Sequence, residues 1–228
     1  MLVIFDIDGT LCQTSRVDDT CWCRAAREIL DIESMTTDWG AYPHSTDEAI
    51  ACALILEHHG VEASRELLDR LQDRFVALVE AVRDADSAEF SETPGASALI
   101  RHLLDKGHHV AIATGGWRRS ALVKMTSAGI PHDGLGAAFA DDAHAREEII
   151  RTAMTRAAEL AELPLESMGP CFYVGDGLWD LRASRVLGIG FLGVATGERA
   201  AALLEAGAPR VLPDFSDLEQ VMDAFGVS

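Results

Sequence analysis

Basic side chains are scarce in this chain: 19 Lys and Arg stand against 37 Asp and Glu, which gives a formal net charge of −18 at pH 7. Proteins that bind nucleic acid generally use clustered lysine and arginine, because contacts to phosphate supply much of their affinity. The charge balance therefore argues against a nucleic acid partner. It also means that an anionic substrate would need locally placed positive charge, from a metal ion and a few basic side chains.

Long apolar runs are absent too. The longest, residues 49–56, is too short to cross a bilayer, and the acidic residues near the N-terminus are not typical of a signal peptide. The five cysteines are an odd and scattered set, which does not indicate a disulfide framework. We therefore expect no membrane partner, and a reducing cytoplasm is the simplest compartment.

The most informative stretch is Asp-Ile-Asp-Gly-Thr at residues 6–10, directly after the apolar run at residues 2–5. Such a run indicates a buried strand, so Asp6 and Asp8 lie where the strand gives way to a loop. Two carboxylates this close repel each other unless a cation or a shared proton relieves the charge. An ordinary turn, in which the aspartates bond their own backbone, is the alternative. The position at a strand end favours a metal-assisted site.

Strand-like and helix-like segments alternate through most of the chain, which is typical of a parallel sheet with helices on both faces. We expect strands at 110–114, 172–176 and 189–194, and helices at 96–105, about 146–161 and 180–187. The sequence thus predicts an α/β fold with a Rossmann-like core.

Residues from about 16 to 88 break this alternation, because they contain helical patterns and no convincing strand. We expect a helix at 18–30, a second after the capping-box spacing of residues 45–48, and a third capped by Ser64.

The predicted organisation is an α/β core at 1–15 and 89–228 with an all-helical cap domain at 16–88 inserted in it. Because the insertion leaves the sheet just after Asp8, it must lie beside the acidic strand end, where a lid over a reaction would have to be.

Further candidate site residues follow other predicted strands. Thr114, with Gly115 and Gly116, offers a hydroxyl and backbone N–H groups suited to phosphate oxygens. Asp176 and Asp180 are one helical turn apart at the end of a later strand. Lys124 and Arg146 are cations in the same part of the chain.

Together these residues resemble the haloacid dehalogenase-like (HAD) hydrolase superfamily. Residues 6–10 match its first motif, Asp-x-Asp-x-Thr; Thr114 matches the second; and residues 175–180 match the fourth, Gly-Asp-x-x-x-Asp. The helical insertion resembles the C1 type of cap. Since dehalogenases lack an acid two residues after the nucleophile, Asp8 favours phosphate-ester chemistry.

The third motif departs from the pattern. Many relatives have a lysine there, often before proline, whereas this chain has Ala-His-Ala-Arg-Glu at residues 143–147. Arg146 is the best match, and an arginine would still stabilise phosphate charge with its planar fork. Lys124 is the second candidate, although it comes early, in the helix after the second motif.

The resemblance implies a mechanism in which Asp6 is the nucleophile that forms an aspartyl-phosphate, and Asp8 is the general acid and then the base. It also implies a Mg²⁺ ion held by oxygen ligands. The implied ligands are the Asp6 and Asp176 carboxylates and the backbone carbonyl of Asp8. Asp180 would either bind the ion itself or hold one of its ligands in place. The residues implied to bind the phosphoryl oxygens are Thr114, Gly115, Gly116 and Arg146. Lys124 is the second candidate for the cation.

We therefore predict a Mg²⁺-dependent phosphatase of a small phosphorylated metabolite. Two alternatives stay open: a sugar-phosphate mutase or phosphotransferase of the same superfamily, and a catalytically impaired binding protein on this fold.

Two segments are candidates for substrate contact. The loop at 39–44 could reach the substrate, and Arg118 and Arg119 after Trp117 could bind a second anionic group. We favour the simpler interpretations, which are a packed loop at 39–44 and solvated charges at 118–119. Monomer and homodimer are both compatible with the sequence.

Overall fold

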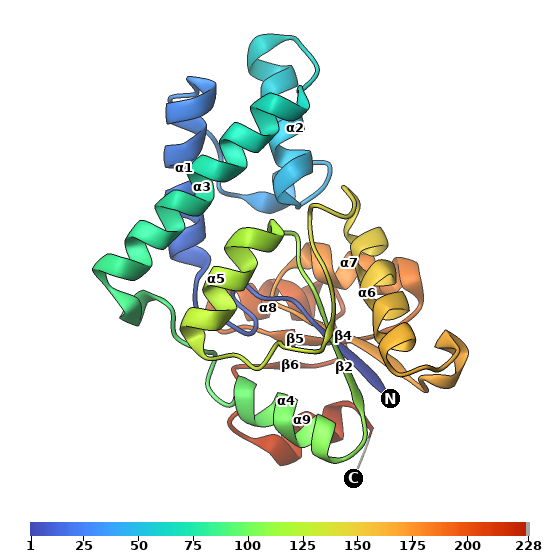
Figure 1. The fold of residues 1–228 in the computed structure, drawn as a ribbon. Helices are drawn as coiled ribbons and strands as arrows, with labels where there is room; N and C mark the ends of the chain where they lie inside the picture. The colour runs from blue at the N-terminus through green and yellow to red at the C-terminus, as the bar shows by residue number, and fades with distance from the viewer. Residues whose placement is uncertain (227–228) are drawn as a thin grey trace.

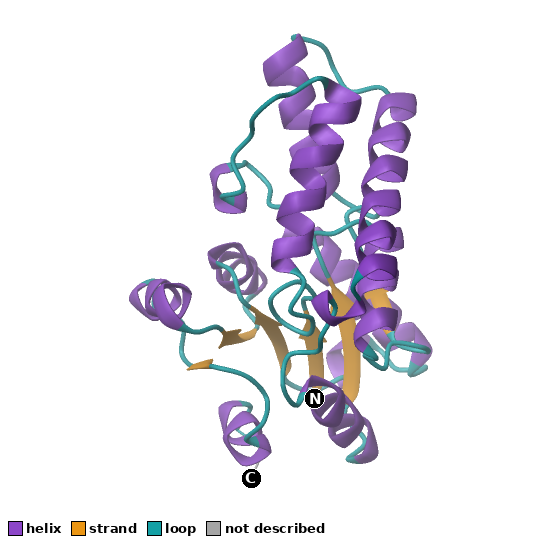
Figure 2. Cartoon of the chain, turned by 90° about the vertical axis from the view of Figure 1, so that its left-hand side faces the viewer, coloured by secondary structure: helices purple, strands orange, loops and turns teal. Residues whose placement is uncertain are grey.

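The protein is described here by a computed structural model over residues 1–226, and a parallel sheet lies at its centre. In the described part of the chain the sheet has six strands in the order β3-β2-β1-β4-β5-β6, all paired in parallel. Figure 2 shows strands of this sheet in orange, with upright helices above them. The strands are β1 (Leu2–Phe5), β2 (His109–Ala113), β3 (Gly136–Ala138), β4 (Cys171–Gly175), β5 (Gly190–Val194) and β6 (Val211–Leu212).

Helices cover both faces of this sheet. One face packs against α4 (Ala96–Asp105), α5 (Arg118–Ala128) and α9 (Leu218–Ala224), and the other packs against α6 (Arg146–Leu160), α7 (Leu178–Leu187) and α8 (Gly197–Glu205). Alternate side chains of the central strand β1 pack against the two helix layers. Val3 and Phe5 face one layer, Leu2 and Ile4 face the other, and all four are fully buried. The predicted α/β class is confirmed.

The remaining long helices form a unit that we call the helical insertion: α1 (Ser15–Leu30), α2 (Asp47–His59) and α3 (Arg65–Ala85). Short 3₁₀ turns follow α1, at Trp39–Ala41, and α3, at Ser87–Glu89. A third 3₁₀ turn, at Leu165–Ser167, lies outside the insertion, between α6 and β4. Residues 16–88 are all described and contain no strand, as predicted. Figure 1 shows these helices, blue to green, standing together beyond one end of the sheet.

The helical insertion has an apolar core of its own, centred on aromatic rings. Trp22 stacks on Trp117 with ring centroids 5.6 Å apart, and the Phe75 ring lies against both. Because Trp117 belongs to the loop after β2, this cluster joins the insertion to the edge of the sheet. Burial of such large rings stabilises the contact between the two parts.

Both helices of the insertion for which the sequence predicts a capped start are present, but only one of the two caps is made. Ser64 caps α3, since its side chain accepts a hydrogen bond from Leu67 N. At α2, Thr46 occupies the N-cap position but makes no capping bond; its hydroxyl donates to the His144 carbonyl at 2.7 Å. Asp47 is drawn into the protein instead, so the capping-box spacing of residues 45–48 serves tertiary contacts.

The two connections between the insertion and the rest of the chain run side by side. Gln13 N donates to Ser91 O at 2.9 Å, and Thr93 N donates to Leu11 O at 2.9 Å. The Gln13 side chain also donates to the Thr93 hydroxyl at 2.8 Å. The insertion therefore leaves and re-enters the chain through a single paired connection.

The sequence predicts neither a membrane-spanning segment nor a disulfide framework. Among the described residues, no helix has both the length and the apolar character needed to cross a membrane. All five cysteines are free thiols.

Candidate active site

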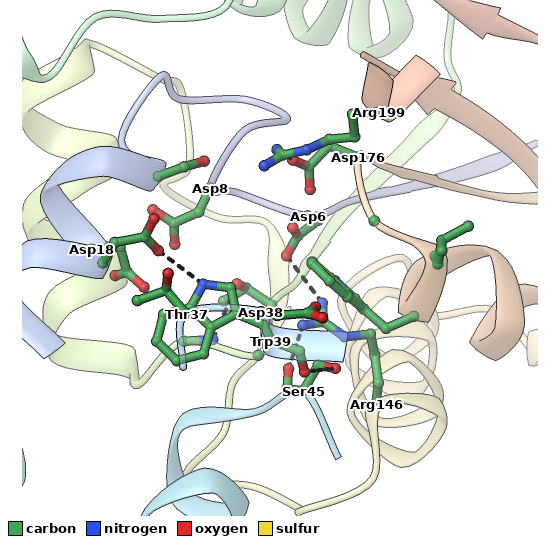
Figure 3. A pocket seen from close by; sticks show the side chains of 18 of the residues that line it. Asp6, Asp8, Asp18, Thr37, Asp38, Trp39, Ser45, Arg146, Asp176 and Arg199 are labelled. Carbon is green, nitrogen blue, oxygen red and sulfur yellow. Dashed lines mark hydrogen bonds and ion pairs between the residues drawn. The ribbon is translucent and has the colours of Figure 1, made fainter. Parts of the chain in front are cut away.

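A cavity of about 270 Å³ lies between the carboxyl edge of the sheet and the helical insertion. In the register of the sheet, Phe5 pairs with Ile112 on one side and Val174 on the other, so the residues that follow these strands emerge together. The lining includes Asp6, Asp8, Thr114, Gly115, Gly116, Arg146 and Asp176 from the core, all of which the sequence singled out. Figure 3 shows several of these side chains around the opening.

Three carboxylates form the acidic centre. One oxygen each from Asp6, Asp176 and Asp180 lies within 4.8 Å of the other two, and all three side chains are buried. Burial, followed by the charge of Asp180, raises the pKa of Asp6 well above its usual range. The same two causes raise the pKa of Asp176 to about 7. Full ionisation of this cluster near neutral pH therefore requires added positive charge.

The loop after β1 approaches this cluster closely, and glycine makes that possible. Gly9 has φ +76°, and a Cβ atom on it would overlap the carboxylate of Asp176. Only glycine combines a left-handed backbone with no side chain at this point. Gly9 thus allows the loops after β1 and β4 to meet.

Arg146, the first residue of α6, provides buried positive charge beside the acids. Its Nη1 lies 3.3 Å from Asp6 Oδ1 and 3.0 Å from Asp180 Oδ1, and its Nη2 donates to Ser45 O at 2.6 Å. Burial lowers the pKa of the guanidinium, but Asp180, Tyr173 and Asp6 more than reverse this shift, so the pKa is raised and the group stays charged. The cation predicted for the third motif is therefore in contact with the predicted nucleophile.

The loop after β2 supplies a small polar concavity. The buried Thr114 hydroxyl accepts a hydrogen bond from Gly116 N at 3.2 Å. Among residues 1–226 no hydrogen bond uses the Gly115 N–H. A Cβ atom on Gly115 would overlap the Arg146 guanidinium and the Ser45 carbonyl. The backbone here comes as close to Arg146 as a glycine allows, so the Gly115 backbone and the guanidinium are neighbours in the cavity lining.

Asp8 faces a different set of partners from Asp6. The Thr14 hydroxyl donates to Asp8 Oδ1 at 2.6 Å, and Lys124 Nζ donates to Asp8 Oδ2 at 2.7 Å. Lys124 is fully buried, also pairs with Asp18 of α1, and does not line the cavity. Of the two cations considered for phosphate, the structure brings Arg146 to the cavity and places Lys124 behind Asp8.

Several residues that the sequence did not single out also line the cavity. They are Ser15, Asp18, Asp19, Asp38, Asp47, Trp179 and Arg199. Asp47 accepts hydrogen bonds from Trp22 Nε1 at 2.7 Å and from Trp117 N at 2.8 Å. Arg199 lies in α8, far from any motif, and forms an ion pair with Asp176. Nothing in the local sequence distinguishes Arg199 from the other surface arginines.

The two loops considered for substrate contact differ. Trp39 lines the cavity, and its indole N–H donates to Asp19 Oδ1 at 2.9 Å. In contrast, Arg118 lies over the Phe139 ring and Arg119 pairs with Asp73. Neither arginine nor the buried Trp117 lines the cavity, so packing and surface pairing account for residues 117–119.

Comparison with known proteins decides the family. The model of the family described as haloacid dehalogenase-like hydrolase matches residues 1–188. The chain belongs to this family. The HAD-like hydrolase is thus an enzyme, and the matched region contains Asp6, Asp8, Thr114 and Asp176. A search of curated proteins found no match to the chain.

The fold of this HAD-like hydrolase is similar to that of several solved proteins. A hydrolase from Pseudomonas syringae matches with a TM-score of 0.74 and 21% identity over 99% of both chains. CbbY from Rhodobacter sphaeroides, solved in complex with phosphate, matches with a TM-score of 0.66 and 21% identity over 95% of both chains. A β-phosphoglucomutase from Clostridium difficile gives 0.65 and 17%, over 99% of this chain and 96% of the other. At these identities the likeness concerns the fold.

Proposed function

We propose that the protein is a Mg²⁺-dependent phosphatase that hydrolyses a small phosphorylated metabolite through an aspartyl-phosphate on Asp6. One observation carries the proposal: the buried Asp6 carboxylate lies at the floor of a cavity, beside Arg146 and two further acids. Arg146 supplies part of the positive charge that an attack on a phosphate monoester requires, and a cation held by the three acids would supply the rest.

The acidic centre is suited to a divalent cation. Asp6, Asp176 and Asp180 present oxygens at short mutual distances, and oxygen is the ligand atom that Mg²⁺ prefers. Asp180 Oδ1 is buried and makes no hydrogen bond, although Arg146 Nη1 is nearby. We assign these three carboxylates and the Asp8 backbone carbonyl as the groups that would hold the ion. When bound, the ion would offset the repulsion between an anionic nucleophile and an anionic substrate.

The protein groups then have distinct roles. Asp6 attacks phosphorus while the bond from phosphorus to the leaving oxygen breaks, and Asp8 gives its proton to that oxygen. Asp8 next takes a proton from a water molecule whose oxygen attacks phosphorus; the bond from phosphorus to Asp6 breaks, which releases inorganic phosphate and regenerates the Asp6 carboxylate. Arg146 and the Thr114–Gly115 loop stabilise the phosphoryl oxygens during both transfers.

The cavity lining favours a substrate without a second anionic group. Among the described residues that line it, the cations are Arg146 and Arg199, and both lie beside the acidic centre. The described lining from the insertion contains no cation; it includes four acids, Asp18, Asp19, Asp38 and Asp47, together with Thr37, Trp39, Ser45 and Ile50. We infer that the part of the substrate that faces the insertion is neutral or cationic.

This lining also weighs against the mutase alternative. A mutase moves a phosphoryl group between two positions of its substrate, so it needs cationic contacts at both ends of its cavity. Here the described lining from the insertion offers acids and neutral side chains and no cation. We further propose that residues 16–88 act as a cap over the core formed by 1–15 and 89–228, since the cavity lies between the two.

The proposal is tested by phosphate release from a panel of phosphorylated metabolites. Asp6→Asn should abolish turnover, and EDTA should do the same to the wild-type enzyme. Asp105→Asn, an exposed acid on α4, is the matched control and should leave activity unchanged. Phosphate release that survives Asp6→Asn would contradict the proposal, and isomerisation of a sugar phosphate without release would favour the mutase.

A further inference from the structure

We propose that Lys124 is a positioning residue, which holds the Asp8 carboxylate in the orientation needed for proton transfer to the leaving oxygen. This inference rests on the proposed phosphatase function, because it concerns the general acid of that reaction. It starts from a buried cation that does not line the cavity and that the mechanism leaves without a role.

The contacts fix Asp8 from two sides. Lys124 Nζ donates to Asp8 Oδ2 at 2.7 Å from α5, and the Thr14 hydroxyl donates to Asp8 Oδ1 at 2.6 Å from the start of α1. A carboxylate whose two oxygens are held by donors from different elements cannot rotate freely. Asp8 nevertheless borders the cavity, with its side chain 21% exposed.

Lys124 itself is held as firmly. It has no solvent exposure, its ammonium forms an ion pair with Asp18 of α1, and the Phe75 ring of α3 lies 5.8 Å from Nζ. Two helices of the insertion, α1 and α3, therefore contact the cation in addition to Asp8. Taking an ammonium group out of water is costly, and an apolar side chain in the same space would often be as stable. Its contact with Asp8 offers a reason for the charge.

The orientation of a general acid matters most when the leaving oxygen is a poor leaving group. An alkoxide needs the proton as the bond to phosphorus breaks, whereas p-nitrophenolate leaves readily without it. Loss of orientation at Asp8 should therefore reduce kcat/KM for an alkyl phosphate selectively. General collapse of the site would reduce kcat/KM for both kinds of substrate.

The test compares p-nitrophenyl phosphate with the alkyl phosphate that the wild-type enzyme turns over best, in Lys124→Met. We use kcat/KM because it reports the first phosphoryl transfer and excludes the later hydrolysis common to both substrates. We expect a loss of roughly 30-fold or more for the alkyl phosphate, toward the usual contribution of a general acid, and a loss within roughly threefold for the aryl phosphate. Lys106→Met, at an exposed lysine, should change neither value.

A second variant guards against misfolding, since removal of one partner of a buried ion pair is strongly destabilising. Lys124→Met combined with Asp18→Asn removes the cation together with its partner on α1, and we expect the same selective loss. In an Asp8→Asn background, Lys124→Met should have no further leaving-group effect. Equal losses for both substrates, or no loss for either, would overturn the role of Lys124. A wild-type protein that hydrolyses neither substrate would instead overturn the phosphatase proposal.

Discussion

Arg199 and Asp176 form an ion pair at the mouth of the cavity, and the two partners differ greatly in environment. The Arg199 side chain is 53% exposed, while that of Asp176 is 4% exposed. The carboxylate of Asp176 is also one of the three that would hold a divalent ion. Arg199 and a bound metal ion would thus compete for the same carboxylate.

The first prediction follows from this competition. Arg199→Gln should lower the Mg²⁺ concentration that gives half-maximal thermal stabilisation by roughly two- to fivefold, the range expected for an ion pair with one exposed partner. Thermal unfolding as a function of Mg²⁺ concentration measures this directly. Arg182→Gln, an exposed arginine on α7, is the control. A midpoint that rises in Arg199→Gln would show that Arg199 assists the ion.

Sequence reasoning reaches some of these residues and not others, for a physical reason. Asp6, Thr114 and Asp176 follow apolar runs, and parallel strands bring their carboxyl ends together, so their meeting could be foreseen. Arg199 and Asp18 enter the site through the packing of helices. No spacing in the sequence records such packing.

The starts of the helices α2 and α3 show that tertiary contacts can override a local sequence pattern. Ser64 and Thr46 both precede helices, and both residue types are favoured as N-caps. Ser64 accepts a bond from its own helix, whereas Thr46 donates to His144, which is distant in sequence. The local pattern is the same, and tertiary contacts decide between the two outcomes.

The second prediction uses this contrast. Ser64→Ala should lower the free energy of unfolding by about 1 kcal/mol, because α3 loses its capping acceptor. Ser64→Asp should retain wild-type stability, since aspartate accepts the same bond and its charge favours a helix N-terminus. Chemical denaturation measures both values. If Ser64→Ala and Ser64→Asp are equally stable, the cap at α3 contributes nothing.

The two edge strands of the sheet, like the helices α8 and α9, are elements that the sequence analysis does not predict. β3 consists of glycine and two alanines, and β6 has only two residues, so neither shows the length or the β-branched pattern that identifies a strand. The predicted strands at 110–114, 172–176 and 189–194 and the helix at 96–105 lie within two residues of their observed ends.

For the molecule as a whole, the acidic centre makes stability depend on pH. Burial, with the charge of Asp180, raises the pKa of Asp176 from 3.8 to about 7, and burial raises the pKa values of Asp6 and Asp180 as well. As the pH rises from about 4 to about 7, these carboxyl groups lose their protons in the unfolded chain but retain them in the folded protein. The contribution of these groups to the free energy of unfolding therefore falls from about pH 4 to about pH 7.

The third prediction isolates one of these groups. In EDTA, Asp176→Asn should gain stability relative to wild type as the pH is raised from about 4 to about 7, because asparagine cannot ionise. With Mg²⁺ the wild type should recover, and its gain in melting temperature should be larger near pH 8 than near pH 5, since the ion binds the deprotonated carboxylates. A stability difference between the two proteins that stays constant with pH would contradict the assignment.

The paired connection at residues 11–13 and 91–93 has a consequence for engineering. Because both chain crossings lie within hydrogen-bonding distance, the helices between them could be excised and the ends rejoined by a short turn, or another helical module could be grafted at the same seam. Any such chimera must also bury the face that it uncovers, because Trp117 and Lys124 would otherwise meet solvent. A replacement module therefore needs an apolar ring for the first and a carboxylate for the second.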